Sequence, residues 1–241
     1  MRGMANKQSK NIISKTLPSL LILVACQVFV ACQTKEQKVE AAFNKCLQLR
    51  DKQKIKEAIV CLEDFVKSNP ERNFTYFILS EDYRKVDRID EAEEAIKYFI
   101  TLNSMNSGGY ESYCRLLEQK GNFEEAYAKC SSAISLDNKN TANWLSAASV
   151  REKVGDFAAA EIYYKNALAL DPKNQAALFF LGVLYEKTGK LDKALETLQK
   201  ALELNPEYSE KLEERIKSIK KRREDEQQKN SAPRTKSKAA I

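Results

Sequence analysis

A pattern of small and apolar residues recurs every 34 residues along this chain, five times in succession and without insertion or deletion. The five repeats are residues 39–72, 73–106, 107–140, 141–174 and 175–208. Their twentieth position is always alanine: Ala58, Ala92, Ala126, Ala160 and Ala194. Their eighth position is always small: Cys46, Ser80, Cys114, Ala148 and Gly182. A repeat of this length predicts similar structural units that stack on one another and share one continuous core.

Each repeat reads as two amphipathic helices, at about repeat positions 2–14 and 18–31. In the fifth repeat Leu178, Leu181 and Tyr185 recur at helical spacing, and Leu195 and Leu198 continue the pattern in the second helix. Small residues at positions 8 and 20 allow the two helix axes to approach closely. Position 15 is glycine in the last three repeats, where a turn with positive φ would end the first helix: Gly121, Gly155 and Gly189.

The small, aromatic and alanine positions together resemble the tetratricopeptide repeat (TPR) family. The fifth repeat matches the family pattern at Leu178, Leu181, Gly182, Tyr185 and Ala194. The resemblance implies an all-α fold, a right-handed superhelix of five helix-turn-helix repeats. It also implies a binding scaffold whose first helices line a concave groove.

The chain beyond the last repeat divides into two segments. Residues 209–228 carry the apolar stripe Leu212, Ile216 and Ile219 amid charges, which predicts a helix that caps the exposed end of the array. Residues 229–241 contain almost nothing to bury, so a disordered basic tail is expected there.

The absence of histidine argues against an enzyme. The 241 residues contain no histidine, which excludes Ser-His-Asp and Cys-His catalysis and histidine metal sites. There is also no glycine-rich phosphate loop. We therefore expect no catalytic residues, no metal, no cofactor and no small-molecule substrate. The alternative in a related class is a regulatory or accessory subunit of an envelope enzyme or of an assembly machine for cell wall, outer-membrane β-barrels or pili. A further alternative is a structural spacer that oligomerises.

The positive charge lies at the ends of the chain. The net charge is +6, but residues 1–15 and 209–241 are the basic segments, and the repeats between them are close to neutral. Basic ends on a neutral array do not form a nucleic-acid groove, so no nucleic-acid partner is expected.

Residues 1–31 have the order of a secretory signal peptide: four positive charges up to Lys15, then an apolar stretch from Thr16 to Ala31. The sequence Phe29-Val30-Ala31-Cys32 resembles a bacterial lipobox, in which the cysteine is acylated and becomes the N-terminus. Cys26 is the alternative, because Leu23-Val24-Ala25-Cys26 fits the first lipobox position better. Cleavage before Cys32 leaves an even number of cysteines in the folded part, which favours Cys32.

This resemblance implies an exported protein anchored to a membrane by lipid, with residues 32–38 as a short tether. An uncleaved signal anchor is the other interpretation, and it also exports the repeats. Gln33 after the cysteine matches the sorting rule for outer-membrane lipoproteins of enteric bacteria, so the predicted location is the bacterial cell envelope, at the outer membrane.

The four cysteines of the repeats form two candidate disulfide pairs. Cys46 and Cys61 are 15 residues apart, and Cys114 and Cys130 are 16 apart. In an antiparallel helix pair that turns near position 15, position 8 faces about positions 20–24, so each pair can meet within its own repeat. The other interpretation is that cysteine only supplies a small apolar side chain at position 8.

In TPR arrays, positions 2, 5, 9 and 12 of each repeat point into the concave groove, which gives this chain an apolar patch on the first two repeats. We expect a protein or peptide partner with apolar anchors and some acidic residues. The lysine and asparagine residues with which chaperone-binding TPR proteins clamp a carboxylate are absent here, since Phe43 and Leu47 stand in two of those places. The candidate groove residues are Phe43, Leu47, Arg50, Phe74, Phe77, Arg84, Arg115 and Phe179.

Overall fold

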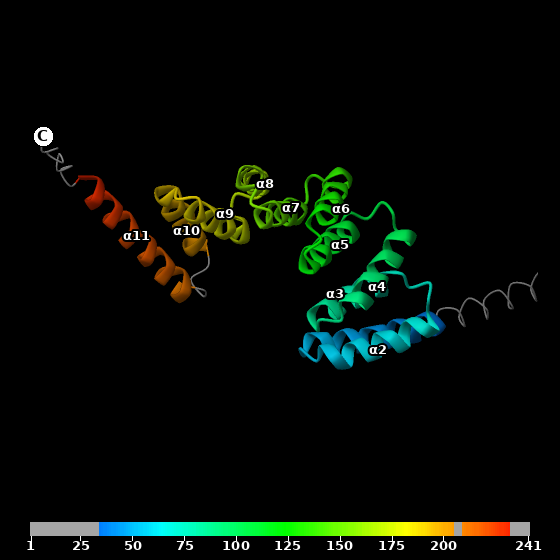
Figure 1. Ribbon diagram of the computed structural model, residues 1–241. Coiled ribbons are helices and arrows are strands. Elements are labelled where there is room, and N and C mark those ends of the chain that lie inside the picture. Colours follow the sequence, from blue (N-terminus) through cyan, green and yellow to red (C-terminus); the bar gives the residue numbers. More distant parts are fainter. Residues whose placement is uncertain (1–33, 205–208, 232–241) are drawn as a thin grey trace, which may run out of the picture. The chain divides into compact units, whose positions relative to one another are not determined.

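The computed structural model describes residues 34–204 and 209–231, and every regular element in these ranges is an α-helix (Figure 1). The chain divides into two compact units, Met1–Val86 and Asp87–Ile241, each described here by itself. The unit boundary falls inside the second predicted repeat, between its two helices. The predicted signal peptide and both lipidation candidates, Cys26 and Cys32, lie outside the described residues.

The first unit contains a helix over residues 34–51, followed by α2 (Ile55–Ser68) and α3 (Phe74–Lys85). The prediction of a tether up to residue 38 differs from the structure, because residues 34–38 are already helical. Glu36 and Glu40 are one helical turn apart, and both form ion pairs with Arg72. These contacts tie the added helical turn to the rest of the unit.

The second unit consists of α4 to α11 (Figure 1). The bounds are α4 Ile89–Leu102, α5 Ser107–Lys120, α6 Phe123–Leu136, α7 Thr141–Lys153, α8 Phe157–Leu170, α9 Gln175–Lys187, α10 Leu191–Leu204 and α11 Ser209–Ser231. The last helix is longer than predicted, because residues 229–231, assigned to the tail, are helical. The residues before them are mostly glutamate and glutamine, which have high helix propensity. Residues 232–241 lie outside the described ranges.

The two small positions of the repeats are core positions. The alanine at position 20 is completely buried in all five repeats. At position 8, Cys46, Ser80, Cys114 and Ala148 are almost completely buried. At Gly182 an added Cβ would lie 2.5 Å from Leu198 Cδ2, so only glycine fits where α9 crosses α10. The all-α fold predicted from this spacing is confirmed.

Each repeat turns at position 15 through a left-handed residue. Gly121, Gly155 and Gly189 have φ values of 81°, 81° and 74°. The first two repeats make the same turn without glycine, at Gln53 (φ 58°) and Asp87 (φ 62°). The left-handed region is strained for residues with a Cβ, so the surrounding fold must hold these two residues there.

An asparagine at repeat position 34 begins the first helix of the following repeat three times. Asn106, Asn140 and Asn174 accept hydrogen bonds of 3.0 Å from the backbone N–H groups of Gly109, Ala142 and Ala177. These side chains cap α5, α7 and α9, whose first N–H groups have no partner inside the helix.

Disulfides join the two helices of the first repeat and the two helices of the third. Cys46 is bonded to Cys61, with Cα atoms 5.4 Å apart, and Cys114 to Cys130, with Cα atoms 5.3 Å apart. These are the two pairs that the spacing suggested. The cysteines at position 8 therefore cross-link their repeats in addition to packing there.

The C-terminal helix covers the end of the second unit. Leu212, Ile216 and Ile219 of α11 are buried in the same apolar cluster as Leu178 and Leu198. α11 thus stands where the first helix of a sixth repeat would stand, and no second helix follows it in the described residues.

Candidate partner-binding surfaces

Carboxylates at position 12 link successive helices of the second unit. Glu118 accepts a hydrogen bond of 2.5 Å from the Ser149 hydroxyl. Glu152 Oε1 lies 3.5 Å from Lys187 Nζ, and its other oxygen accepts a hydrogen bond from the Tyr164 hydroxyl at 3.2 Å. Burial and this carboxylate raise the pKa of Tyr164, so the phenol stays protonated and remains a donor. These position-12 carboxylates already have partners and hold the repeats together.

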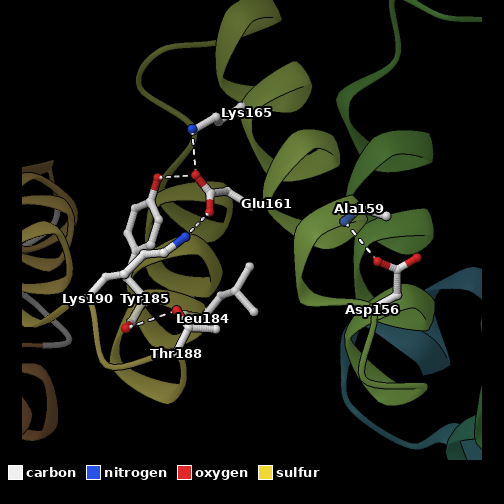
Figure 2. A network of polar contacts seen from close by, with 8 residues as sticks. All are labelled: Asp156, Ala159, Glu161, Lys165, Leu184, Tyr185, Thr188 and Lys190. Atoms are coloured by element: carbon white, nitrogen blue, oxygen red, sulfur yellow. Dashed lines mark hydrogen bonds and ion pairs between the residues drawn. The ribbon is translucent and has the colours of Figure 1, made fainter.

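A second polar contact joins α8 to α9, as Figure 2 shows. The Glu161 carboxylate lies 2.6 Å from both Lys165 Nζ and Lys190 Nζ and accepts a hydrogen bond from the Tyr185 hydroxyl. The hydrogen bonds from Lys165 and Lys190 lower the pKa of Glu161 to about 2.

The same arrangement occurs between α4 and α5, at the same repeat position. Glu93 accepts from Lys120 and Lys97, each at 2.5 Å, and these bonds lower its pKa to about 2. We call the groups around Glu93 and Glu161 the two clasps. Each clasp joins one helix to the next and so has a structural role.

The second unit contains a groove of 970 Å³ between α9 and α11. Ala176, Phe179 and Glu186 line it, from repeat positions 2, 5 and 12, as do Phe180 and Leu212. The Phe179 and Phe180 rings meet edge to face with centroids 5.5 Å apart, and Phe180 is 44% exposed. We call this the C-terminal groove.

One glutamate of the C-terminal groove is paired with arginines of α11. Glu186 forms ion pairs with Arg215 Nε at 2.6 Å and with Arg222 Nη1 at 3.0 Å. Glu186 is therefore neutralised by α11, and Glu210, Lys211 and Glu214 line the groove as well.

A smaller pocket of 270 Å³ lies in the first unit, here called the N-terminal pocket. Its floor is aromatic: Phe43 and Phe65 have ring centroids 5.3 Å apart, and Phe74 lines one side. Phe74 is 54% exposed and stacks on Phe77 at 5.4 Å. Its charged lining residues are Glu40, Glu71 and Arg72.

The structure corrects the role predicted for Arg50, which was placed at the edge of the apolar patch. Arg50 Nε lies 2.6 Å from Asp82 Oδ2, and the Asp82 side chain is fully buried. A buried carboxylate needs a paired cation, so Arg50 stabilises the first unit.

The remaining predicted groove residues have mixed surroundings. Arg84 forms an ion pair with Glu81 at 2.9 Å and is mostly buried. Arg115 lies in the second unit, with its Nε 3.8 Å from Glu111. Leu47 is half-buried. Of the eight predicted residues, Phe43 and Phe74 line the N-terminal pocket and Phe179 lines the C-terminal groove.

Most residues that line these surfaces were not among the predicted site residues, and they include Phe65, Phe180 and Arg215. Phe65 stands at position 27, in a second helix, where the family pattern does not point into the groove. Arg215 was predicted to lie in the cap. In a sixth first helix it would stand at position 7, which is not one of positions 2, 5, 9 and 12, so the repeat register gave no signal for it.

Within the described ranges, no group of three or more His, Cys, Asp or Glu side chains is arranged to hold a metal ion. None of the helices there has both the length and the apolar character needed to cross a membrane.

Comparison with known proteins identifies the fold. Residues 153–213 match the family model of the tetratricopeptide repeat. No curated protein sequence matches the chain. A thermophilic TPR protein of Thermus thermophilus superposes with a TM-score of 0.65 at 24% identity, over 75% of this chain and 98% of that one.

Two further solved structures are similar. PilW, described as a widely conserved type IV pilus biogenesis factor, has a TM-score of 0.64 at 22% identity, over 70% of this chain and 78% of that one. MamA has a TM-score of 0.57 at 20% identity, over 71% of this chain and 93% of that one. With the helix pairs and the small crossing positions, these similarities show that the chain has the helical fold of tetratricopeptide repeat proteins, and residues 153–213 match the model of that repeat.

Proposed function

We propose that this protein is a membrane-anchored scaffold of a bacterial cell envelope that holds a protein partner in its C-terminal groove. The observation that carries the proposal is the groove itself: 970 Å³, lined by Ala176, Phe179 and Glu186 at the positions that face the concave side of a TPR array. A cavity of this size with exposed aromatic residues is typical of a binding site.

The partner expected here is a helical or extended segment with apolar anchors. Phe179 and Phe180 offer aromatic surface, and α11 already neutralises Glu186. Aromatic residues in a well-packed pocket commonly provide most of the binding energy of an interface.

Export is supported by the two disulfides and by the N-terminal sequence. Disulfides persist in the periplasm and outside the cell and are rare in the cytosol. The basic segment, apolar stretch and Cys32 follow the order of a lipoprotein signal. A role in assembling an envelope structure is part of this proposal, and the similar protein PilW is described as a type IV pilus biogenesis factor.

Affinity recovery from detergent-solubilised envelope tests the binding proposal. The wild-type chain should return one stoichiometric partner, and Phe179→Ala with Phe180→Ala should lose it. Ile162→Ala is the control, since Ile162 is 58% exposed on α8 and does not line the groove. Equal recovery from the double variant and the control would reject the groove as the site.

Metabolic labelling with palmitate tests the anchor. Cys32→Ser should leave an unprocessed, unlabelled precursor, while Cys26→Ser should be labelled normally. The reverse pattern would move the lipid to Cys26, and labelling of both single variants and their double variant would reject lipidation at either residue.

A further inference from the structure

The N-terminal pocket has a volume suited to one side chain. At 270 Å³ it is smaller than the cavities of about 300–1,000 Å³ that hold whole small molecules. Its floor consists of Phe43 and Phe65, whose rings are tilted at 41°, with Phe74 exposed at the side. A long side chain that entered here would lie along aromatic ring faces.

The charge around this pocket is negative. Glu40 and Glu71 line it, and Glu36 lies beside it on the helix of residues 34–51 through its ion pair with Arg72. Among the described residues of the lining, Arg72 is the single cation, and it is held by Glu36, with Glu40 Oε2 at 3.9 Å. The Glu71 carboxylate has no hydrogen-bond or ion-pair partner in the part of the chain that the structure describes.

The two arginines that the sequence predicted near this pocket do not change its negative charge. Arg50 forms an ion pair with buried Asp82, and Arg84 forms one with Glu81. An acidic partner segment, as expected from the sequence, would therefore meet carboxylates at this pocket instead of free arginines.

We propose that the N-terminal pocket receives a lysine or arginine side chain from the partner segment. The aliphatic stem of such a residue packs on the rings of Phe43 and Phe65, because long basic side chains bury their stems and keep the charge at the edge. The cation then lies near the exposed ring of Phe74 and within reach of Glu40 and Glu71.

This inference rests on the proposed binding of a protein segment, but it concerns a different surface from the C-terminal groove. A chain that loses its partner through Phe179→Ala with Phe180→Ala while showing no preference for basic residues would support the proposed function and reject this inference alone.

Fluorescence anisotropy of the full chain in an uncharged detergent, with a protein-free micelle blank, tests the inference. The probe is a fluorescein-labelled peptide amide, Ala-Leu-Xaa-Leu-Ala, in which Xaa is arginine, norleucine or glutamate. The arginine peptide should bind about tenfold more tightly than the norleucine peptide, which equals one charge-assisted contact, and the glutamate peptide should bind most weakly.

Glu40→Gln with Glu71→Gln should abolish the preference for arginine and leave binding of the norleucine peptide unchanged. Glu57→Gln is the matched control, because Glu57 is an exposed glutamate at the start of α2, paired with Lys54 at 3.7 Å. Circular dichroism verifies that each variant folds.

Three results would overturn the inference. Equal affinity for the arginine and norleucine peptides would show that the pocket recognises only the apolar part of the side chain. An arginine preference that survives in the double variant would place the contact elsewhere. If the protein self-associates at higher concentration, seen as a rise in its molecular mass, and peptide binding weakens at the same time, a second copy of the chain occupies the pocket.

Discussion

The N-terminal pocket and the C-terminal groove occupy equivalent places in the first and fifth repeats, yet their volumes are 270 and 970 Å³. Phe43 and Phe179 both stand at repeat position 5. At position 27, however, the first repeat has Phe65 and the fifth has Ala201, and both residues line their cavities. The benzyl group of Phe65 fills space in the N-terminal pocket, whereas the methyl group of Ala201 leaves the corresponding space in the C-terminal groove open.

The comparison shows how one repeat scaffold provides two kinds of surface. Positions 8 and 20, which set the helix crossing, are small in both repeats, so the backbone arrangement is kept. Position 27 differs between the two repeats, and both of its residues are buried beside their cavities. The first repeat therefore presents a small acidic aromatic pocket, and the fifth presents a wide groove with glutamates, a lysine and an arginine in its lining.

The largest effect is expected from Phe65→Ala, which gives the first repeat the residue of the fifth. Phe65 is 7% exposed and packs on Phe43, so its removal should lower the free energy of unfolding by about 3–5 kcal/mol. Urea unfolding followed by circular dichroism measures this. Val60→Ala, at a 58% exposed site on the same helix, should change little. Similar values for the two variants would show that Phe65 is not part of the core.

The substitutions Arg50→Met and Arg115→Met compare a cation paired with a buried carboxylate and a more exposed cation. Arg50→Met should cost about 3 kcal/mol, the lower end for breaking a buried pair, because Arg50 is 26% exposed and Lys85 also contacts Asp82. Arg115→Met should change stability by less than about 0.5 kcal/mol, since Arg115 is 41% exposed and its Nε lies 3.8 Å from Glu111. A larger loss for Arg115 than for Arg50 would contradict these assignments.

The sequence predicted the helix pairs because their positions depend on local periodicity and on the small residues at each crossing. It also identified Phe43, Phe74 and Phe179 as cavity residues, since these follow from the register of the repeat. It did not predict that Arg50 would pair with Asp82, because that contact depends on which side chain of the next helix is buried opposite. The left-handed turns at Gln53 and Asp87 were missed for a similar reason, because the surrounding fold there overrides the intrinsic preference for glycine.

Acid should weaken the second unit through its two clasps. The pKa values of Glu93 and Glu161 are lowered from 4.5 to about 2, so this stabilisation is fully present above pH 4.5 and is lost as the pH falls toward 2. Each clasp should contribute about 1 kcal/mol, because solvent screens the partly exposed lysines. Melting temperatures between pH 7 and pH 2.5 measure the loss. Glu161→Gln should reduce the pH dependence, and an unchanged profile would exclude the clasp as its source.

The smallest effect concerns the turns. Gln53→Gly should stabilise the first unit by about 0.5–1 kcal/mol, because it relieves a left-handed residue at the cost of chain entropy. Gly121→Ala should destabilise the second unit by a similar amount. Thermal unfolding of both variants measures the pair of effects, and changes of the same sign would contradict the assigned turn conformations.

Photo-crosslinking from the C-terminal groove tests most directly whether the space beside Ala201, at position 27 of the fifth repeat, is the binding surface. Benzoylphenylalanine is introduced at position 180 in the groove and at the exposed position 162 outside it, and the envelope is irradiated. The account predicts one crosslinked partner from position 180, none from position 162, and loss of the product when Ala201→Phe fills the groove. The same product from both positions, or an undiminished product in the Ala201→Phe chain with unchanged circular dichroism, would contradict it.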